Sequence, residues 1–133
     1  MLDDLEKLEI MPVLGAKDRL QEIKSNGFGL MIITARREDL FKNYTEKWLS
    51  KHYNGIFDDI IYANHFHKEK SRDKSEICIE LGITEIIEDN FDYALDLANK
   101  GIKAHLIEKP WNNWQNINHE NIIRVKNWGE III

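Results

Sequence analysis

The chain has 133 residues, which is enough for one domain that buries roughly two-thirds of its unfolded surface. Its apolar fraction of 43% and charged fraction of 31% are ordinary for a globular protein. The net charge of −5 and the short apolar runs argue against nucleic acid and membranes as partners, and the single cysteine fits a reducing compartment, so we expect a cytoplasmic protein.

Helix and strand patterns alternate along the chain. Apolar residues spaced three or four apart, followed by Gly or Asn, are typical of helices. They predict helices at residues 1–8, Ala16–Ser25, Glu38–His52, 73–81 and 92–99. Short apolar runs are typical of strands in a covered parallel sheet. They predict strands at residues 28–33, 56–63, Glu85–Glu88, Lys103–Ile107 and, as a short fifth one, Ile122–Val125.

This alternation predicts an α/β fold of one domain, residues 1–133. Strands that alternate with helices form right-handed crossovers, so helices should cover both faces of a mostly parallel, three-layer Rossmann-like sheet. In such sheets the binding site lies beyond the carboxyl ends of the strands. Thr34, the loop at residues 64–72 and the pair Glu88 and Asp89 all fall at that edge. We therefore expect them to converge, together with Lys74, on one anion site.

Each of these groups suits phosphate or a metal ion. A threonine after a buried strand can donate its hydroxyl to a phosphoryl oxygen, and the following turn offers backbone N–H groups. A lysine at a helix start adds positive charge to the same oxygens. Adjacent carboxylates at a strand end suit Mg²⁺, which takes oxygen ligands and bridges to phosphate. The predicted site is thus Thr34, Ala35, Arg36 and Lys74 for phosphate, and Asp89 and Glu88 for Mg²⁺.

Structural explanations stand beside these functional ones. Thr34 can simply end a strand, and Lys74 can be a solvated side chain. Arg36 fits either a bidentate phosphate contact or a surface pair with Glu38. Asn90 fits the N-cap of the helix that follows it, which would make the acidic pair part of a helix start.

Three further features also have both a structural and a functional interpretation. Cys78 lies in a helical apolar stripe, which favours a buried inert thiol over a catalytic one. The loop at residues 64–72 is basic, which is typical of a solvated loop or of anion attraction. It also contains His65 and His67, and this spacing alone is a weak zinc signal.

The chain resembles the haloacid dehalogenase superfamily of phosphohydrolases, and within it the 5′(3′)-deoxyribonucleotidase-like branch. By this resemblance Thr34 matches the phosphate-binding hydroxyl of the second motif, Lys74 the lysine of the third, and Asp89, beside Glu88, the magnesium ligand of the fourth. It implies that Thr34 and Lys74 belong to the catalytic site. The matching stretches are Gly15-Ala16-Lys17, Ile32-Ile33-Thr34-Ala35-Arg36, Lys74-Ser75-Glu76-Ile77, Ile87-Glu88-Asp89-Asn90 and Lys109-Pro110-Trp111-Asn112.

The sequence departs from that superfamily at the first motif. The family's nucleophile is the first aspartate of an Asp-x-Asp that ends an apolar strand, and this sequence contains no Asp-x-Asp. The resemblance implies that residues 1–11 are a remnant of the cap or a linker helix. It also implies that the absent strand is central, between the strands ending at Thr34 and Glu88. We expect compensation, by direct pairing, by the apolar segment at residues 129–133, by an upstream piece, or by a second copy in a homodimer.

The resemblance therefore implies a nucleotidase-type, Mg²⁺-dependent phosphomonoesterase scaffold that acts on a small phosphorylated substrate such as a nucleoside monophosphate. As written, the chain lacks the nucleophile and would be inactive alone. The alternative is a non-catalytic relic that binds a phosphorylated ligand or a protein. A receiver-type or flavodoxin-like domain is a weaker alternative. Such domains need an acidic cluster near the first strand, and this sequence has none there.

Overall fold

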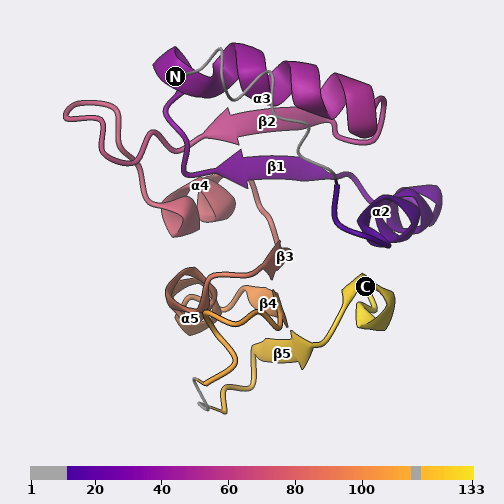
Figure 1. Cartoon of the computed structure of the whole chain (residues 1–133). Helices are drawn as coiled ribbons and strands as arrows, with labels where there is room; N and C mark the ends of the chain where they lie inside the picture. Colours follow the sequence, from indigo (N-terminus) through magenta and orange to yellow (C-terminus); the bar gives the residue numbers. More distant parts are fainter. Residues whose placement is uncertain (1–11, 115–117) are drawn as a thin grey trace. The chain divides into compact units, whose positions relative to one another are not determined.

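The computed structural model describes residues 12–114 and 118–133 of the chain (Figure 1). The chain divides into two compact units, Met1–Arg72 and Asp73–Ile133. The helix predicted at residues 1–8 and the cap remnant predicted at residues 1–11 lie outside the described residues. The prediction of one domain over residues 1–133 stays a prediction.

In its described residues, the first unit is a two-stranded parallel sheet with two helices. Strand β1 pairs with β2 in a register that places Thr34 beside Tyr62. Both strands therefore end at the same edge of this sheet. The elements of the unit are α2 (Ala16–Ser25), β1 (Met31–Thr34), α3 (Glu38–His52) and β2 (Asp59–Tyr62).

Side-chain hydrogen bonds to the backbone hold the helices and loops of this unit together. The Lys24 Nζ of α2 donates to the carbonyl oxygens of Gly55 (2.7 Å) and Ile56 (3.1 Å) in the loop before β2. The Asn64 side chain, just after β2, accepts from the Glu38 N–H at the first turn of α3 (2.8 Å). Asn64 thus satisfies a helix N-terminal donor that would otherwise lack a partner.

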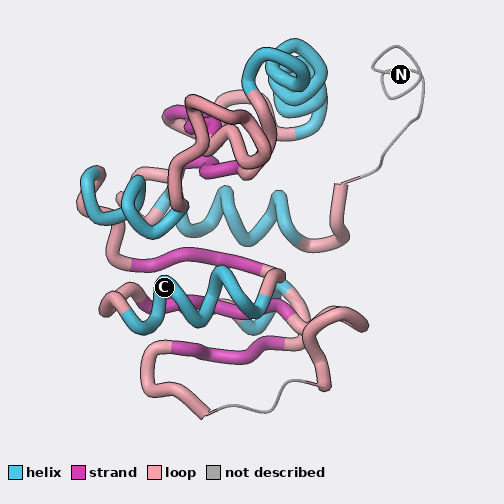
Figure 2. Tube along the Cα trace, turned by 90° about the vertical axis from the view of Figure 1, so that its left-hand side faces the viewer, coloured by secondary structure: helices cyan, strands magenta, loops and turns pink. Residues whose placement is uncertain are grey.

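The second unit is a three-stranded parallel sheet, in the order β3-β4-β5. Helix and strand alternate from α4 to β4, and β5 then follows β4 with no described helix between them. Figure 2 shows the helices of the chain in cyan and its strands in magenta. The elements are α4 (Lys74–Glu80), β3 (Glu85–Glu88), α5 (Phe91–Asn99), β4 (Lys103–Ile107), β5 (Ile122–Val125) and the 3₁₀ turn η1 (Trp128–Glu130).

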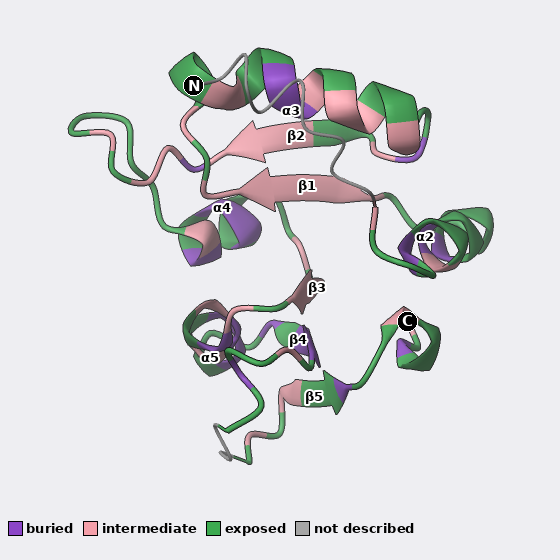
Figure 3. Cartoon of the chain, in the orientation of Figure 1, coloured by how far each residue is buried: buried purple, intermediate pink, exposed green. Residues whose placement is uncertain are grey.

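Strand β4 is the buried centre of this sheet, and its two faces have different covers. Helix α5 packs Phe91 and Ala94 against Ala104 and Leu106, all buried. Figure 3 shows the buried part of α5 in purple. On the opposite face, Ile107 and Val125 pack against Ile131, which follows η1 and has no exposed surface. Apolar side chains on both faces are what a central parallel strand requires.

These observations confirm an α/β fold with parallel pairing and, among the described residues, four α-helices. They do not confirm one continuous Rossmann-like sheet. Among the described residues β1 pairs with β2 and β3 pairs with β4, so direct pairing of β1 with β3 is not confirmed. The segment at residues 129–133 forms no strand and instead packs Ile131 on the second unit. No described helix is long and apolar enough to cross a membrane.

The C-terminal segment offers a direct test of its packing role. Ile131→Ala should lower the free energy of unfolding by about 2–4 kcal/mol, because it removes a fully buried side chain and leaves a cavity. Ile132→Ala is the matched control, since Ile132 is exposed and its loss should change stability by less than about 0.5 kcal/mol. Urea titration followed by circular dichroism measures both. Equal values for the two variants would contradict the packing described for Ile131.

Candidate functional site

The turn that follows β1 carries the first group of predicted phosphate ligands. The Thr34 hydroxyl oxygen accepts a hydrogen bond from the Arg36 N–H (3.2 Å). The hydroxyl proton has no acceptor among the described residues. The Ala35 N–H has no acceptor among the described residues, and alternation along β1 directs it away from β2. Thr34 and Ala35 thus present two donors at the end of the strand.

The Arg36 side chain lies on α3. Its guanidinium donates to the Thr45 hydroxyl (2.8 Å) and lies 5.7 Å from the centre of the Phe41 ring and 5.4 Å from that of Tyr44. These distances are typical of cation–π contacts. The predicted alternative, an ion pair between Arg36 and Glu38, is wrong, because the guanidinium contacts Thr45 instead. Phosphate binding by Arg36 stays a prediction.

Lys74 and Glu88 form the main polar contact of the second unit. Lys74 is the first residue of α4 and Glu88 the last of β3. The Lys74 Nζ lies 3.2 Å from Glu88 Oε2, and the two side chains are 10% and 9% exposed. The ammonium also lies 4.3 Å from the centre of the Tyr93 ring. A charge held this far from water needs such partners.

The second oxygen of Glu88 holds the turn between β3 and α5. Glu88 Oε1 accepts from the backbone N–H groups of Asp89 (3.1 Å) and Asn90 (3.2 Å). The Asn90 side chain then accepts from the Tyr93 N–H (3.0 Å), which confirms the predicted N-cap. Both oxygens of Glu88 are therefore engaged within the protein.

Asp89 differs from Glu88, because it is exposed and its carboxylate has no partner among the described residues. Its carbonyl oxygen is held instead. It accepts from Asn112 Nδ2 (2.7 Å) and from Trp111 Nε1 (3.0 Å), both in the loop after β4. Asn112 is fully buried and also donates to the Ile107 carbonyl oxygen (2.9 Å). This positioning role of Asn112 was not predicted, and the Lys109-Pro110-Trp111-Asn112 turn was its only sequence signal.

The second unit thus brings Lys74, Glu88 and Asp89 together at the carboxyl end of β3. Thr34, Ala35 and Arg36 lie in the first unit, and their convergence with the other three stays a prediction. The other predicted metal signal was the pair His65 and His67. Their ring nitrogens contact backbone groups, His65 the Arg72 carbonyl oxygen and His67 the N–H groups of Glu69 and Lys70. No cluster of three or more His, Cys, Asp or Glu suited to a metal occurs in the part of the chain that the structure describes.

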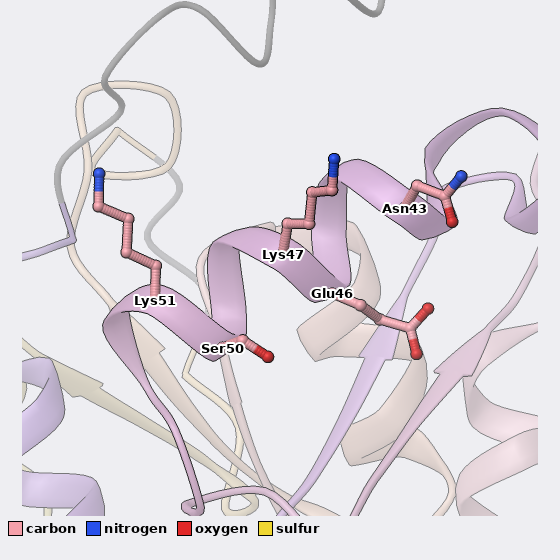
Figure 4. A pocket seen from close by; sticks show the side chains of 5 residues that line it. All are labelled: Asn43, Glu46, Lys47, Ser50 and Lys51. Carbon is pink, nitrogen blue, oxygen red and sulfur yellow. The ribbon is translucent and has the colours of Figure 1, made fainter.

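A separate hollow lies along α3 in the first unit. It is open and has a volume of about 550 Å³, and its described lining residues lie on one face of the helix (Figure 4). None of the predicted site residues lines it. Its lining residues are Asn43, Glu46, Lys47, Ser50 and Lys51.

Cys78 lies in α4, one turn after Lys74, and is fully buried as predicted. Burial raises the pKa of its thiol to about 11, and the nearby Lys74 acts in the opposite direction, while Glu88 raises it further. Burial also raises the pKa of Tyr93, with a smaller contribution from Glu88. Both groups are therefore neutral near pH 7.

Comparison with known proteins identifies a curated relative of the chain. No family model matches the chain. The chain is 33% identical over 110 residues, 80% of its length, to a curated nucleotidase of Clostridium acetobutylicum. That alignment covers 50% of the nucleotidase, so the chain spans about half the length of this relative. The chain is a distant relative of a nucleotidase.

Loss of the Lys74 ammonium should destabilise the second unit. Lys74→Met should cost about 3 kcal/mol of unfolding free energy, because Glu88 keeps a buried charge without its partner. Lys42→Met is the control: Lys42 pairs with Glu38 at 3.6 Å, both side chains are about half exposed, and the expected loss is about 0.5 kcal/mol or less. Urea titration compares them, and similar losses would argue against a buried pair.

Cys78 should react slowly with iodoacetamide in the native protein. With a pKa of about 11, only about 0.1% of the thiol is thiolate at pH 8, compared with about 10% at the ordinary value of 9.0. Alkylation should therefore be at least ~100-fold slower than in the same protein unfolded in urea, and it should accelerate as the pH rises toward 11. Mass spectrometry follows the reaction, and rapid labelling of the native chain at pH 8 would show an accessible thiol.

Proposed function

We propose that this chain is the phosphate- and magnesium-binding part of a nucleotidase-type phosphomonoesterase with a haloacid dehalogenase-like core. The observation that carries the proposal is the Lys74–Glu88 contact beside the exposed carboxylate of Asp89 at the end of β3. The relationship to a nucleotidase over 80% of the chain supports the same reaction class.

In this proposal Lys74 is the charge that faces the phosphoryl group. An ammonium has three N–H donors, and the contact with Glu88 uses one of them. The carboxylate of Glu88 fixes the ammonium in place, so little reorganisation is needed when negative charge develops on the phosphoryl oxygens. Thr34 and the Ala35 N–H would bind another oxygen of the same group, as predicted from the sequence.

Asp89 is the residue that fits Mg²⁺. Its carboxylate is exposed and without a partner among the described residues, and Mg²⁺ in phosphate sites often uses only one or two carboxylates with water and phosphate oxygens. Glu88 fits this role less well, since both of its oxygens accept hydrogen bonds. A bound Mg²⁺ would neutralise charge on the phosphoryl group. We therefore assign Asp89 as the metal ligand and Glu88 as a positioning residue.

One observation favours a second function, binding of a phosphorylated ligand without hydrolysis. The sequence has no Asp-x-Asp, the motif that provides the nucleophile in the superfamily that the chain resembles. The two functions share the phosphate site and differ in turnover, so one set of measurements separates them.

The test measures binding and hydrolysis of a nucleoside monophosphate by the full chain, with and without Mg²⁺. Thr34→Val should weaken binding about 10-fold, because it removes a hydrogen bond to a charged group. Asp89→Asn should abolish the gain in affinity that Mg²⁺ provides. Titration calorimetry gives the affinities, and release of inorganic phosphate gives the turnover.

Matched controls exist for both substitutions. Thr84→Val changes an exposed threonine before β3, and Asp92→Asn an exposed aspartate in α5. Neither should alter binding. Turnover supports the hydrolase, and binding without turnover supports the second function. A chain that binds neither inorganic phosphate nor the nucleotide, at any Mg²⁺ concentration, would rule out both.

A further inference from the structure

Phe66 has an unusual combination of backbone conformation and exposure. It lies in the loop that joins β2 to α4, and its φ angle is 67°. Its side chain is 98% exposed. A single exposed apolar residue is common, but a bulky residue in the left-handed region is strained, and Gly or Asn usually occupies such positions. Strain of this kind is retained where the surrounding structure fixes it, often at ligand sites.

Hydrogen bonds on both sides of Phe66 fix the loop. The His67 N–H donates to the Asn64 carbonyl oxygen (3.0 Å), which closes a tight turn around Phe66. His65 contacts the Arg72 carbonyl oxygen through its ring (3.0 Å), and the Arg72 N–H donates to the Ala63 carbonyl oxygen (2.8 Å). The ring of Phe66 is therefore held out into solvent by an ordered turn.

This turn is bound directly to the segment that carries Thr34. The His65 N–H donates to the Ala35 carbonyl oxygen (2.9 Å), and the Ala63 N–H donates to that of Thr34 (2.8 Å). Phe66 follows His65, and consecutive Cα atoms are about 3.8 Å apart. The exposed ring thus belongs to the same end of the first unit as the Thr34 hydroxyl and the Ala35 N–H.

The loop is also positively charged in an acidic protein. Residues 64–72 contain three exposed cations and one carboxylate, which gives +2 for the loop against −5 for the chain. The polar and charged neighbours of Phe66 leave one ring rather than a broad apolar patch, and a protein partner would need the larger area. The cations are Lys68, Lys70 and Arg72, and the carboxylate is Glu69.

We propose that Phe66 is the base-stacking residue for a nucleoside monophosphate whose phosphate is bound at Thr34 and Ala35. This inference rests on the proposed function and extends it to the choice of substrate. An aromatic ring beside a basic, donor-rich turn matches a ligand that has both an aromatic base and an anionic group. Stacking accepts any base, because each base has a π-face.

The test compares three probes by titration calorimetry on the full chain: a nucleoside monophosphate, ribose 5-phosphate and inorganic phosphate. Phe66→Ala should weaken binding of the nucleotide about 5- to 100-fold and leave the other two probes unchanged. Phe66→Trp should retain nucleotide affinity, since it keeps an aromatic face. Leu14→Ala is the control, because Leu14 is 96% exposed in the same unit and outside this loop.

The outcomes separate this inference from the proposed function. If inorganic phosphate and ribose 5-phosphate bind but the nucleotide gains nothing from Phe66, base stacking is wrong and the phosphate site stands. Equal weakening of all three probes by Phe66→Ala would show a structural role for the loop and would also overturn stacking. If none of the probes binds, both proposals fail.

Discussion

The contacts among Lys74, Asp89 and Asn90 at the carboxyl end of β3 depend on the carboxylate of Glu88. One oxygen holds the Lys74 ammonium at 3.2 Å, and the other accepts the N–H groups of Asp89 and Asn90. A buried carboxylate requires such partners, since an unpaired one would carry a large desolvation cost. Its bonds thus link the first residue of α4 to the turn after β3. A substitution of Glu88 would therefore remove the contact with Lys74 and both hydrogen bonds in the turn at once.

The two units share one arrangement, in which short parallel strands end at polar groups. Each sheet also has a strand with an unpaired edge. Alternation along β1 points the N–H and C=O groups of Met31 and Ile33 away from β2, and along β3 those of Glu85 and Ile87 away from β4. No described residue pairs with these edges. Apolar, half-buried edges of this kind are open to pairing with a further strand.

The sequence predicts most helices and strands correctly, because apolar spacing and stop signals lie within each element. Helices Ala16–Ser25 and Glu38–His52 and the three strands of the second unit have the predicted bounds, since apolar spacing and helix stop signals specify them. The first two strands were predicted too long, as apolar residues extend past the hydrogen-bonded ladder, and β1 covers only Met31–Thr34. The single sheet was not confirmed, because strand partners are set by contacts distant in sequence. At the site, the contact of Arg36 with Thr45 has no local sequence signature, and the turn at residues 109–112 is the only local signal for the buried Asn112.

The isolation of Cys78 in α4 has a use for spectroscopy. It is the sole cysteine of the chain, and it is fully buried. A cysteine introduced on the surface would therefore be the one readily labelled sulfur, with no need to replace the native one. Ser71→Cys in the loop after β2 or Asn113→Cys in the loop after β4 would each place a fluorophore or spin label at one defined exposed position. Either unit can therefore carry a single probe, because the buried native thiol of Cys78 does not react with the label.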